Sequence, residues 1–226
     1  MSVAAIIPVK RFPAAKSRLA SALGSAGRAA VAEAMLTDVL AACGSTESLD
    51  EVVVVTGELR AQRAAARAGA RVVADPADRG HSDAALLGIA ACPGADAVAL
   101  LPGDCPLLDA GELDRALAAL TARSEAGPAV TVVPDRHRTG TNALLLAPPT
   151  AIEPAFGPGS RDRHVELARG AGASVEVARL DSLALDLDTP DDLDALAAAV
   201  TERPELATTR ILSELAAEPS PDALHR

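Results

Sequence analysis

The chain has 226 residues, an apolar composition of 49% and a formal net charge of −10. Its length and apolar content are enough for one compact α/β domain, but the length is too small for two domains of average size. Trp and Tyr are absent and Phe occurs only twice, so an aromatic platform for stacking bases is not expected. The acidic balance, with no run of Lys or Arg, argues against a nucleic-acid partner and favours small substrates.

Short apolar runs alternate with Ala-rich stretches of helical period in the first half of the chain. This is the pattern of a βαβ sheet covered by helices on both faces. Parallel, central strands are predicted at Val3–Pro8, Val52–Thr56, Arg71–Ala74 and Ala97–Leu101. The crossover helices are predicted at Ala26–Ala42, Glu58–Ala68 and Ser82–Ala91.

The second half begins with a helix over Leu107–Ser124, for which Asp109 is the predicted N-cap and Glu112 occupies the capping-box position. Two strands follow, joined by a polar loop over 135–140 that is long enough to hold a ligand. They are predicted at Ala129–Pro134 and Thr141–Ala147.

A Gly/Pro-rich turn over 156–160 then leads into a helix at Arg161–Arg169. Further strands are predicted at Ser174–Ala178 and Leu183–Leu187, before a helix with Thr189 as N-cap and Pro190 in its first position. Residues 1–200 are thus expected to form one domain, and 201–226 a polar helical tail. The apolar faces of 191–200 and 206–215 are expected to be core, with pairing in a homodimer as the open alternative.

Three widely spaced cysteines, Cys43, Cys92 and Cys105, suggest neither a disulfide framework nor a zinc site, and fit free thiols in a reducing cytosol. The N-terminal apolar run over 3–9 is too short to cross a bilayer. A cytoplasmic protein with no membrane partner is therefore expected.

Cationic side chains gather just after the first predicted strand, at Lys10, Arg11, Lys16 and Arg18. Open α/β sheets bind ligands at the carboxyl ends of their strands, so this loop could hold a triphosphate. It lacks the pattern of a P-loop, and a solvated basic loop is the alternative.

Acidic residues follow two other predicted strands. Asp104 comes directly after the fourth strand, where it could ligate Mg²⁺ or instead cap the next helix. Asp186 and Asp188 are two apart on a predicted strand and should face the same side. Asp191 and Asp192 fit the first turn of a helix better than a metal site.

Two segments between these clusters, 138–142 and 156–161, are rich in backbone and hydroxyl donors that bind anions, and the second opens a helix. Each could equally be an ordinary turn. His137, His164 and His225 show no spacing typical of a metal site or a proton-transfer triad, and His81 receives no catalytic role although it could border a nucleotide pocket. Without a GxSxG elbow or a Cys/His pair, covalent catalysis has no support.

The ordered motifs PVK with KSRL, GDCPL, TGTN, FGPGS and DLDTP resemble the 2-phospho-L-lactate (or phosphoenolpyruvate) guanylyltransferase family of coenzyme F-420 biosynthesis over about residues 1–200. The lysine loop and Asp104 are shared by many nucleotidyltransferases, whereas FGPGS and TGTNALLL are more specific. The resemblance implies a single-domain, GT-A-like (Rossmann-like) α/β nucleotidyltransferase fold with a mostly parallel mixed sheet flanked by helices. Family members usually carry an Asn in a Leu-Asn pair where this chain has GHSDAA at 80–85.

The resemblance also implies roles for individual residues. It places Asp104 and Lys16 in catalysis, and it makes Mg²⁺ the cofactor. Metal ligation falls to Asp104, Asp186 and Asp188, nucleotide binding to Pro8, Lys10, Lys16, Arg18 and Gly80, and acceptor binding to Thr141, Gly157 and Ser160.

The implied substrates are GTP and a small phosphorylated three-carbon acid, and the implied by-product is pyrophosphate. The Ala- and Arg-rich composition favours phosphoenolpyruvate over 2-phospho-L-lactate by association with actinobacterial members. The alternatives are a nucleotidyltransferase for a sugar phosphate or molybdopterin, and a non-catalytic nucleotide-binding domain of the same fold.

Overall fold

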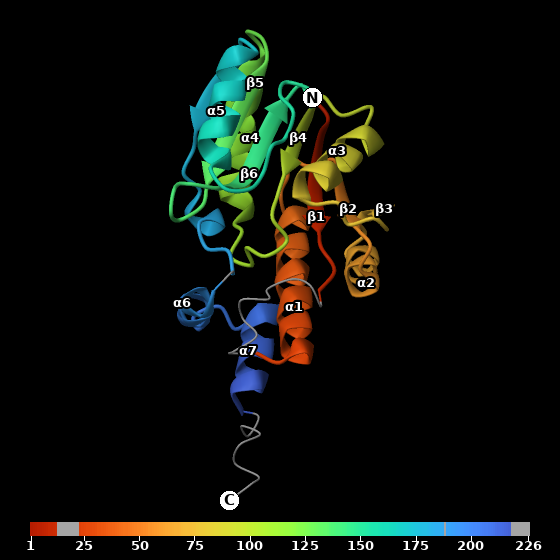
Figure 1. Ribbon diagram of the computed structural model, residues 1–226, viewed down its shortest axis with the longest axis vertical. Coiled ribbons are helices and arrows are strands. Elements are labelled where there is room, and N and C mark those ends of the chain that lie inside the picture. Colours follow the sequence, from red (N-terminus) through yellow and green to blue (C-terminus); the bar gives the residue numbers. More distant parts are fainter. Residues whose placement is uncertain (13–22, 188, 218–226) are drawn as a thin grey trace, which may run out of the picture.

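The computed structural model describes residues 1–12, 23–187 and 189–217 (Figure 1). The strands of this part form one sheet of order β3-β2-β1-β4-β6-β5-β7, in which only β6 runs antiparallel to its neighbours. The strands are β1 (Val3–Val9), β2 (Glu51–Thr56), β3 (Arg71–Ala74), β4 (Ala97–Leu100), β5 (Ala129–Pro134), β6 (Thr141–Ala147) and β7 (Ser174–Val177). The predicted mixed, mostly parallel sheet is confirmed, although β3 is an edge strand rather than a central one.

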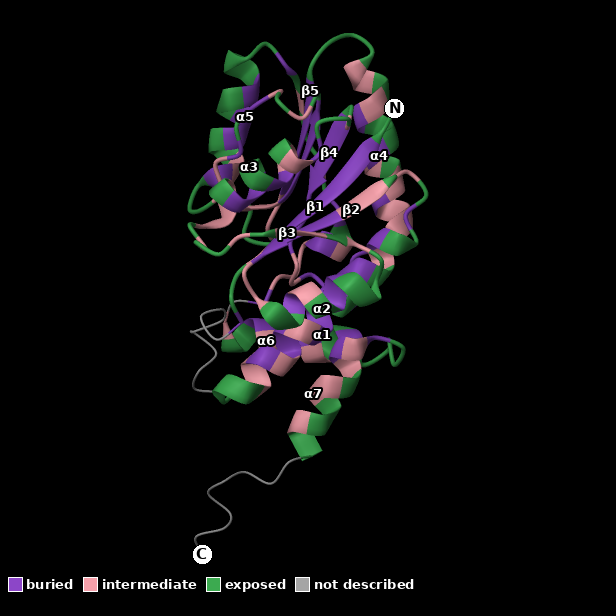
Figure 2. Ribbon diagram, turned by 90° about the vertical axis from the view of Figure 1, so that its right-hand side faces the viewer, coloured by how far each residue is buried: buried purple, intermediate pink, exposed green. Residues whose placement is uncertain are grey.

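Helices cover both faces of the sheet, so its inner strands are buried on both sides (Figure 2). Side chains of α1 (Ser25–Gly44), α2 (Leu59–Arg67) and α4 (Ala110–Ser124) pack on one face. Those of α3 (His81–Ala91) and α5 (Ser160–Gly170) pack on the other. Double coverage explains why β1, β4 and β6 are nearly continuous apolar runs.

Small residues let the helices approach the sheet closely. A Cβ atom added to Gly88 of α3 would lie 2.3 Å from Ile6 Cγ2 and 3.0 Å from Val55 Cγ2. The backbone of α3 therefore rests directly on β1 and β2, which fixes where the N-terminus of this helix lies relative to the sheet.

The predicted strand at Leu183–Leu187 is wrong. The chain forms a 3-10 turn, η2 (Asp181–Leu183), and continues without pairing to the sheet. Leu183 packs in the cluster on one sheet face, whereas Leu187 packs in a separate cluster with α1, α6 (Pro190–Val200) and α7 (Ala207–Ala217). The alternating apolar residues of this segment thus pack in two separate clusters and do not form one strand.

Helix caps follow the sequence closely. Asp109 caps α4 by accepting from the Glu112 N–H at 2.8 Å, but the Glu112 carboxylate accepts from the Ser182 N–H instead of completing a capping box. Thr189 and Asp192 do form a capping box at the start of α6.

The expected polar tail contains α7, which lies along α1 (Figure 1). Buried Asp38 of α1 accepts hydrogen bonds from the backbone N–H groups of Ala207 and Thr208, at 2.7 and 2.9 Å. Leu206 and Leu215 join the apolar cluster with α1 and α6, which confirms that these faces are core. Among the described residues, no helix is long and apolar enough to span a bilayer.

Candidate active site

The central strands β1 and β4 are parallel and in register, so their carboxyl ends meet at one edge of the sheet. Ile6 pairs with Leu100, and the Leu101 N–H donates to the Ile6 carbonyl. Lys10 and half-buried Asp104, each four residues beyond this pair, therefore emerge at the same edge. Pro8 lies buried inside β1.

The N-terminus of α3 reaches the same place. Burial lowers the pKa of His81 to about 4, and the charges of Asp104 and Lys10 act on the same ring in opposite directions. These three groups are therefore close enough to interact, which brings Lys10, Asp104 and the 80–82 segment together. Gly80 precedes the helix with φ +122°, a conformation that favours glycine, and a Cβ there would meet no atom within 4 Å.

The predicted acceptor residues also lie together. Thr141 begins β6, and its Oγ1 is 3.0 Å from Nδ1 of His164, which is fully buried in α5. Buried Ser160 is the first residue of α5, and its N–H donates to the Gly157 carbonyl at 3.0 Å. The Arg161 N–H donates to the Thr139 carbonyl, which joins the two predicted anion-binding segments.

The hydrogen bonds of His164 fix its tautomer. The backbone N–H of Ala155 donates to Nε2 at 2.9 Å, so Nε2 must accept. Burial lowers the pKa of His164 to about 4, so the ring is neutral at pH 7 and its single proton is on Nδ1. Nδ1–H then donates to Thr141 Oγ1, which leaves the Thr141 hydroxyl proton available for a ligand.

An aromatic contact links the N-terminus of α3 to α5. The Phe156 ring packs in a T-shaped arrangement against both His81 and His164, with ring centroids 4.5 and 5.2 Å apart, respectively. The Phe156 N–H also donates to Ser82 Oγ at 2.9 Å. The first turn of α3 and the FGPGS segment are thus held against each other by two different interactions.

Asp186 lies beside the start of β6. The Asn142 Nδ2 atom donates to the Leu183 carbonyl at 2.7 Å and is 3.5 Å from Asp186 Oδ1. Since 183–187 is not a strand, alternation does not decide where Asp188 points, and Asp188 lies outside the described residues, as do Lys16 and Arg18. Within the described chain, no three His, Cys, Asp or Glu side chains form a group that could hold a metal ion.

Sequence reasoning missed His164, Ser82 and Phe156 as parts of one network. The available signal was that His164 follows Ser160 by four residues, which places both on one face of a helix. Its hydrogen-bond partner Thr141 is 23 residues away, so no local pattern could reveal the pair.

The comparisons agree on a family. The family model described as "Guanylyl transferase CofC like" matches residues 3–202. A phosphoenolpyruvate guanylyltransferase of Conexibacter woesei is 47% identical over 90% of this chain and 91% of its own. A 3-phospho-D-glycerate guanylyltransferase of Phenylobacterium zucineum is 39% identical over 93% of this chain and 95% of its own. The names of these two relatives differ in the acceptor.

The solved structures bear on the fold. A putative nucleotide-diphospho-sugar transferase from Desulfovibrio desulfuricans superposes with a TM-score of 0.73 at 18% identity, covering 96% of both chains. A nucleotidyl transferase from Methanothermobacter thermautotroptrophicus superposes with a TM-score of 0.62, also at 18% identity, over 89% of this chain and 99% of its own. The predicted nucleotidyltransferase fold is therefore confirmed.

Proposed function

The chain belongs to the CofC-like guanylyl transferase family, and on that premise we propose that it transfers GMP from GTP to phosphoenolpyruvate and releases pyrophosphate in coenzyme F-420 biosynthesis. The chain is a nucleotidyltransferase. The observation that carries the proposal is the chain of contacts from His81 through Phe156 to His164 and Thr141, with the charges of Lys10 and Asp104 acting on His81 at its start. It sets a charged side suited to a nucleotide beside a donor-rich side suited to an acidic acceptor.

The chemistry needs positioning more than proton transfer. An oxygen of the acceptor phosphate attacks the α-phosphorus of GTP, a new P–O bond forms, and the bond to the β-phosphate oxygen breaks as pyrophosphate leaves. Because that oxygen is already ionised at pH 7, no general base is required. This agrees with His81 and His164, whose pKa values of about 4 keep both rings neutral.

Two anions must approach each other in this reaction, and we assign their placement to the following groups. Lys10 attracts the triphosphate, and Lys16 and Arg18 are expected to bind it as well. Thr141 donates its hydroxyl proton to the acceptor, and the turn from Gly157 to Ser160, which has φ +115° at Gly157 and +70° at Gly159, offers backbone donors.

Mg²⁺ is part of the proposal. When bound, it would offset the charge that develops on the phosphates. Half-buried Asp104 and Asp186 present carboxylates at the sheet edge, which suits an ion that needs few protein ligands in addition to substrate phosphates, and Asp188 is the expected third ligand. We also place the reaction in the cytoplasm, in keeping with the free thiols.

Phosphoenolpyruvate is proposed as the acceptor because several relatives carry that name, and 2-phospho-L-lactate, which differs at one carbon, is the alternative. The test measures pyrophosphate release with Mg²⁺ and GTP, and compares phosphoenolpyruvate, 2-phospho-L-lactate, 3-phospho-D-glycerate, a sugar phosphate and no acceptor. ATP and CTP replace GTP as nucleotide controls. Release that requires GTP and phosphoenolpyruvate is expected. Release with another acid would correct the acceptor, and release only with a sugar phosphate would overturn the proposal.

A further inference from the structure

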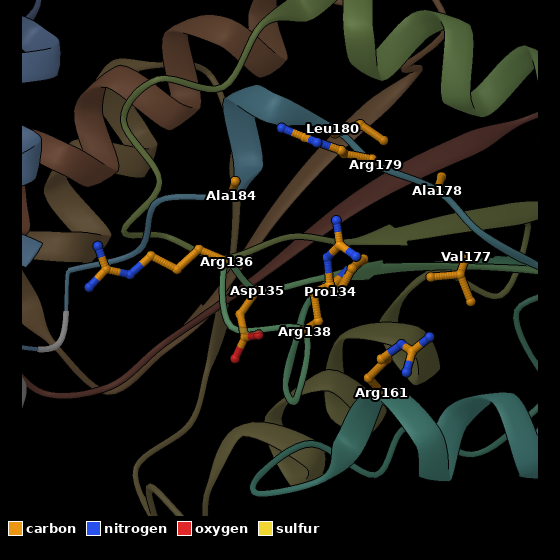
Figure 3. A pocket seen from close by; sticks show the side chains of 10 residues that line it. All are labelled: Pro134, Asp135, Arg136, Arg138, Arg161, Val177, Ala178, Arg179, Leu180 and Ala184. Carbon is orange, nitrogen blue, oxygen red and sulfur yellow. The ribbon is translucent and has the colours of Figure 1, made fainter.

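A cavity of about 410 Å³ lies at the same edge of the sheet, beyond the ends of β5 and β7 (Figure 3). Its walls come from the loop between β5 and β6, the first turn of α5, and the segment after β7. Four arginines and one aspartate line it: Arg136, Arg138, Arg161, Arg179 and Asp135. We call this cavity the arginine pocket. Its excess of positive charge contrasts with the net charge of −10 for the chain.

One of the four arginines has a structural role. Arg136 forms an ion pair with Asp192, which is only 5% exposed and caps α6. In Figure 3 the Arg136 side chain extends away from the other three guanidinium groups. This arginine therefore fastens the loop to α6 and is not counted as a ligand group.

The other three guanidinium groups are weakly engaged. Arg179 pairs with Asp181 at 2.5 Å, but the two side chains are 76% and 68% exposed. Arg161 pairs with Asp162, whose side chain is 75% exposed. Such water-exposed pairs contribute little and yield readily to a stronger anion. Within the described residues, no hydrogen bond or ion pair is recorded for the side chain of Arg138.

The carboxylate of Asp135, in the pocket wall, already accepts two hydrogen bonds from the loop. Asp135 accepts from the backbone N–H groups of Thr139 and Gly140, at 3.0 and 2.9 Å. These bonds close the loop around Arg138, whose φ of +60° is unusual for a residue with a side chain. Asp135 thus shapes the loop that presents Arg138.

Arg161 supplies the observation that points to a ligand. Its Nε atom is buried and has no hydrogen-bond partner in the described part of the protein. A buried donor without an acceptor is unfavourable, and reorientation of the Arg161 guanidinium toward an oxyanion in the pocket would relieve it. The rigid fork of a guanidinium suits phosphate oxygens in particular.

We propose that the arginine pocket is a second anion site, which binds a small phosphorylated molecule through Arg138, Arg161 and Arg179, next to the site of nucleotidyl transfer. Arg161 directly follows Ser160 and its N–H is bonded to Thr139, so a ligand there holds both acceptor-binding segments. That link to the acceptor rests on the proposed function. Binding of the anion itself does not.

The test is calorimetric titration of the full chain with inorganic phosphate, in a chelator and without Mg²⁺. The pocket variant is Arg138→Gln/Arg179→Gln, and the control of equal charge is Arg63→Gln/Arg203→Gln. The control is matched because Arg203 pairs with exposed Glu205 at 2.5 Å, two residues along the chain, as Arg179 does with Asp181. Thermal unfolding of both variants checks that they are folded.

Loss of two charge-assisted contacts should raise the Kd of phosphate by at least about tenfold in the pocket variant and leave the control within about twofold of wild type. Equal binding by the pocket variant and wild type would overturn the proposal. So would an equal loss in the control, which would reveal a general charge effect, or a wild type that does not bind. The measurement needs no turnover, so its failure is separate from failure of the guanylyltransferase assay.

Discussion

His164 is expected to act as a positioning residue for the acceptor, and two substitutions can separate its two hydrogen bonds. The amide of Gln reaches about as far as Nε2 of the ring, so His164→Gln should keep a partner for the Ala155 N–H and lose the donor to Thr141. Asn reaches about as far as Nδ1, so His164→Asn should keep the donor to Thr141 and lose the partner of Ala155. Both variants lose the imidazole ring, so a difference between them reports the contact with Thr141.

The magnitude follows from the bonds lost. A neutral hydrogen bond contributes about 0.5–1.5 kcal/mol, so kcat/KM for the acceptor should fall by roughly 2- to 13-fold more in His164→Gln than in His164→Asn. Both variants lose the edge contact with Phe156 and leave a buried polar group unpaired, so each should lose about 2–4 kcal/mol of unfolding free energy. The KM for GTP should change little.

The assay is steady-state pyrophosphate release with each substrate varied in turn, accompanied by urea unfolding of the same preparations. If His164 were merely structural, each of the two substitutions would lower acceptor kcat/KM only in proportion to the stability that it costs. If His164→Gln and His164→Asn have equal acceptor kcat/KM while their stabilities are equal, the reasoning about Thr141 is refuted.

Three further outcomes are expected. Asp104→Asn should lower turnover by at least about a hundredfold while the unfolding midpoint stays near that of wild type, and an active variant would remove Asp104 from the metal site. The depressed pKa of His164 means that the unfolded chain binds a proton at this ring first as the pH falls, which should remove up to about 3 kcal/mol of unfolding free energy between pH 6.5 and 4. His81, whose pKa is also about 4, adds a further loss, so urea curves of His164→Gln should show a smaller drop than wild type, with the His81 share remaining. Gly88→Ala should cost about 1–3 kcal/mol, because its Cβ would overlap Ile6, and an unchanged melting temperature would show that α3 can shift.

The sheet could be predicted from sequence because strands covered on both faces need apolar side chains at nearly every position, as in β1 and β6. The same rule failed for 183–187, where a similar run of Leu residues contacts two different clusters. Only tertiary packing distinguishes these cases. A contiguous motif such as FGPGS could be singled out from sequence, whereas the contact between Thr141 and His164 could not, because only the fold brings these two residues together.

The arrangement also explains how an acidic chain with few aromatic residues can run a reaction between two anions. Of its two Phe residues, Phe156 is at the junction of the first turn of α3 and α5, where its N–H is bonded to Ser82 and its ring lies between two neutral histidines. If either histidine were charged, the Phe156 ring would lie against an imidazolium whose charge changes with pH. Burial suppresses that charge, so the proposed partners of the phosphates are Lys10 and the expected Lys16 and Arg18. Alignment of the proposed nucleotide and acceptor sites therefore depends on packing and neutral hydrogen bonds, which do not change with protonation near pH 7.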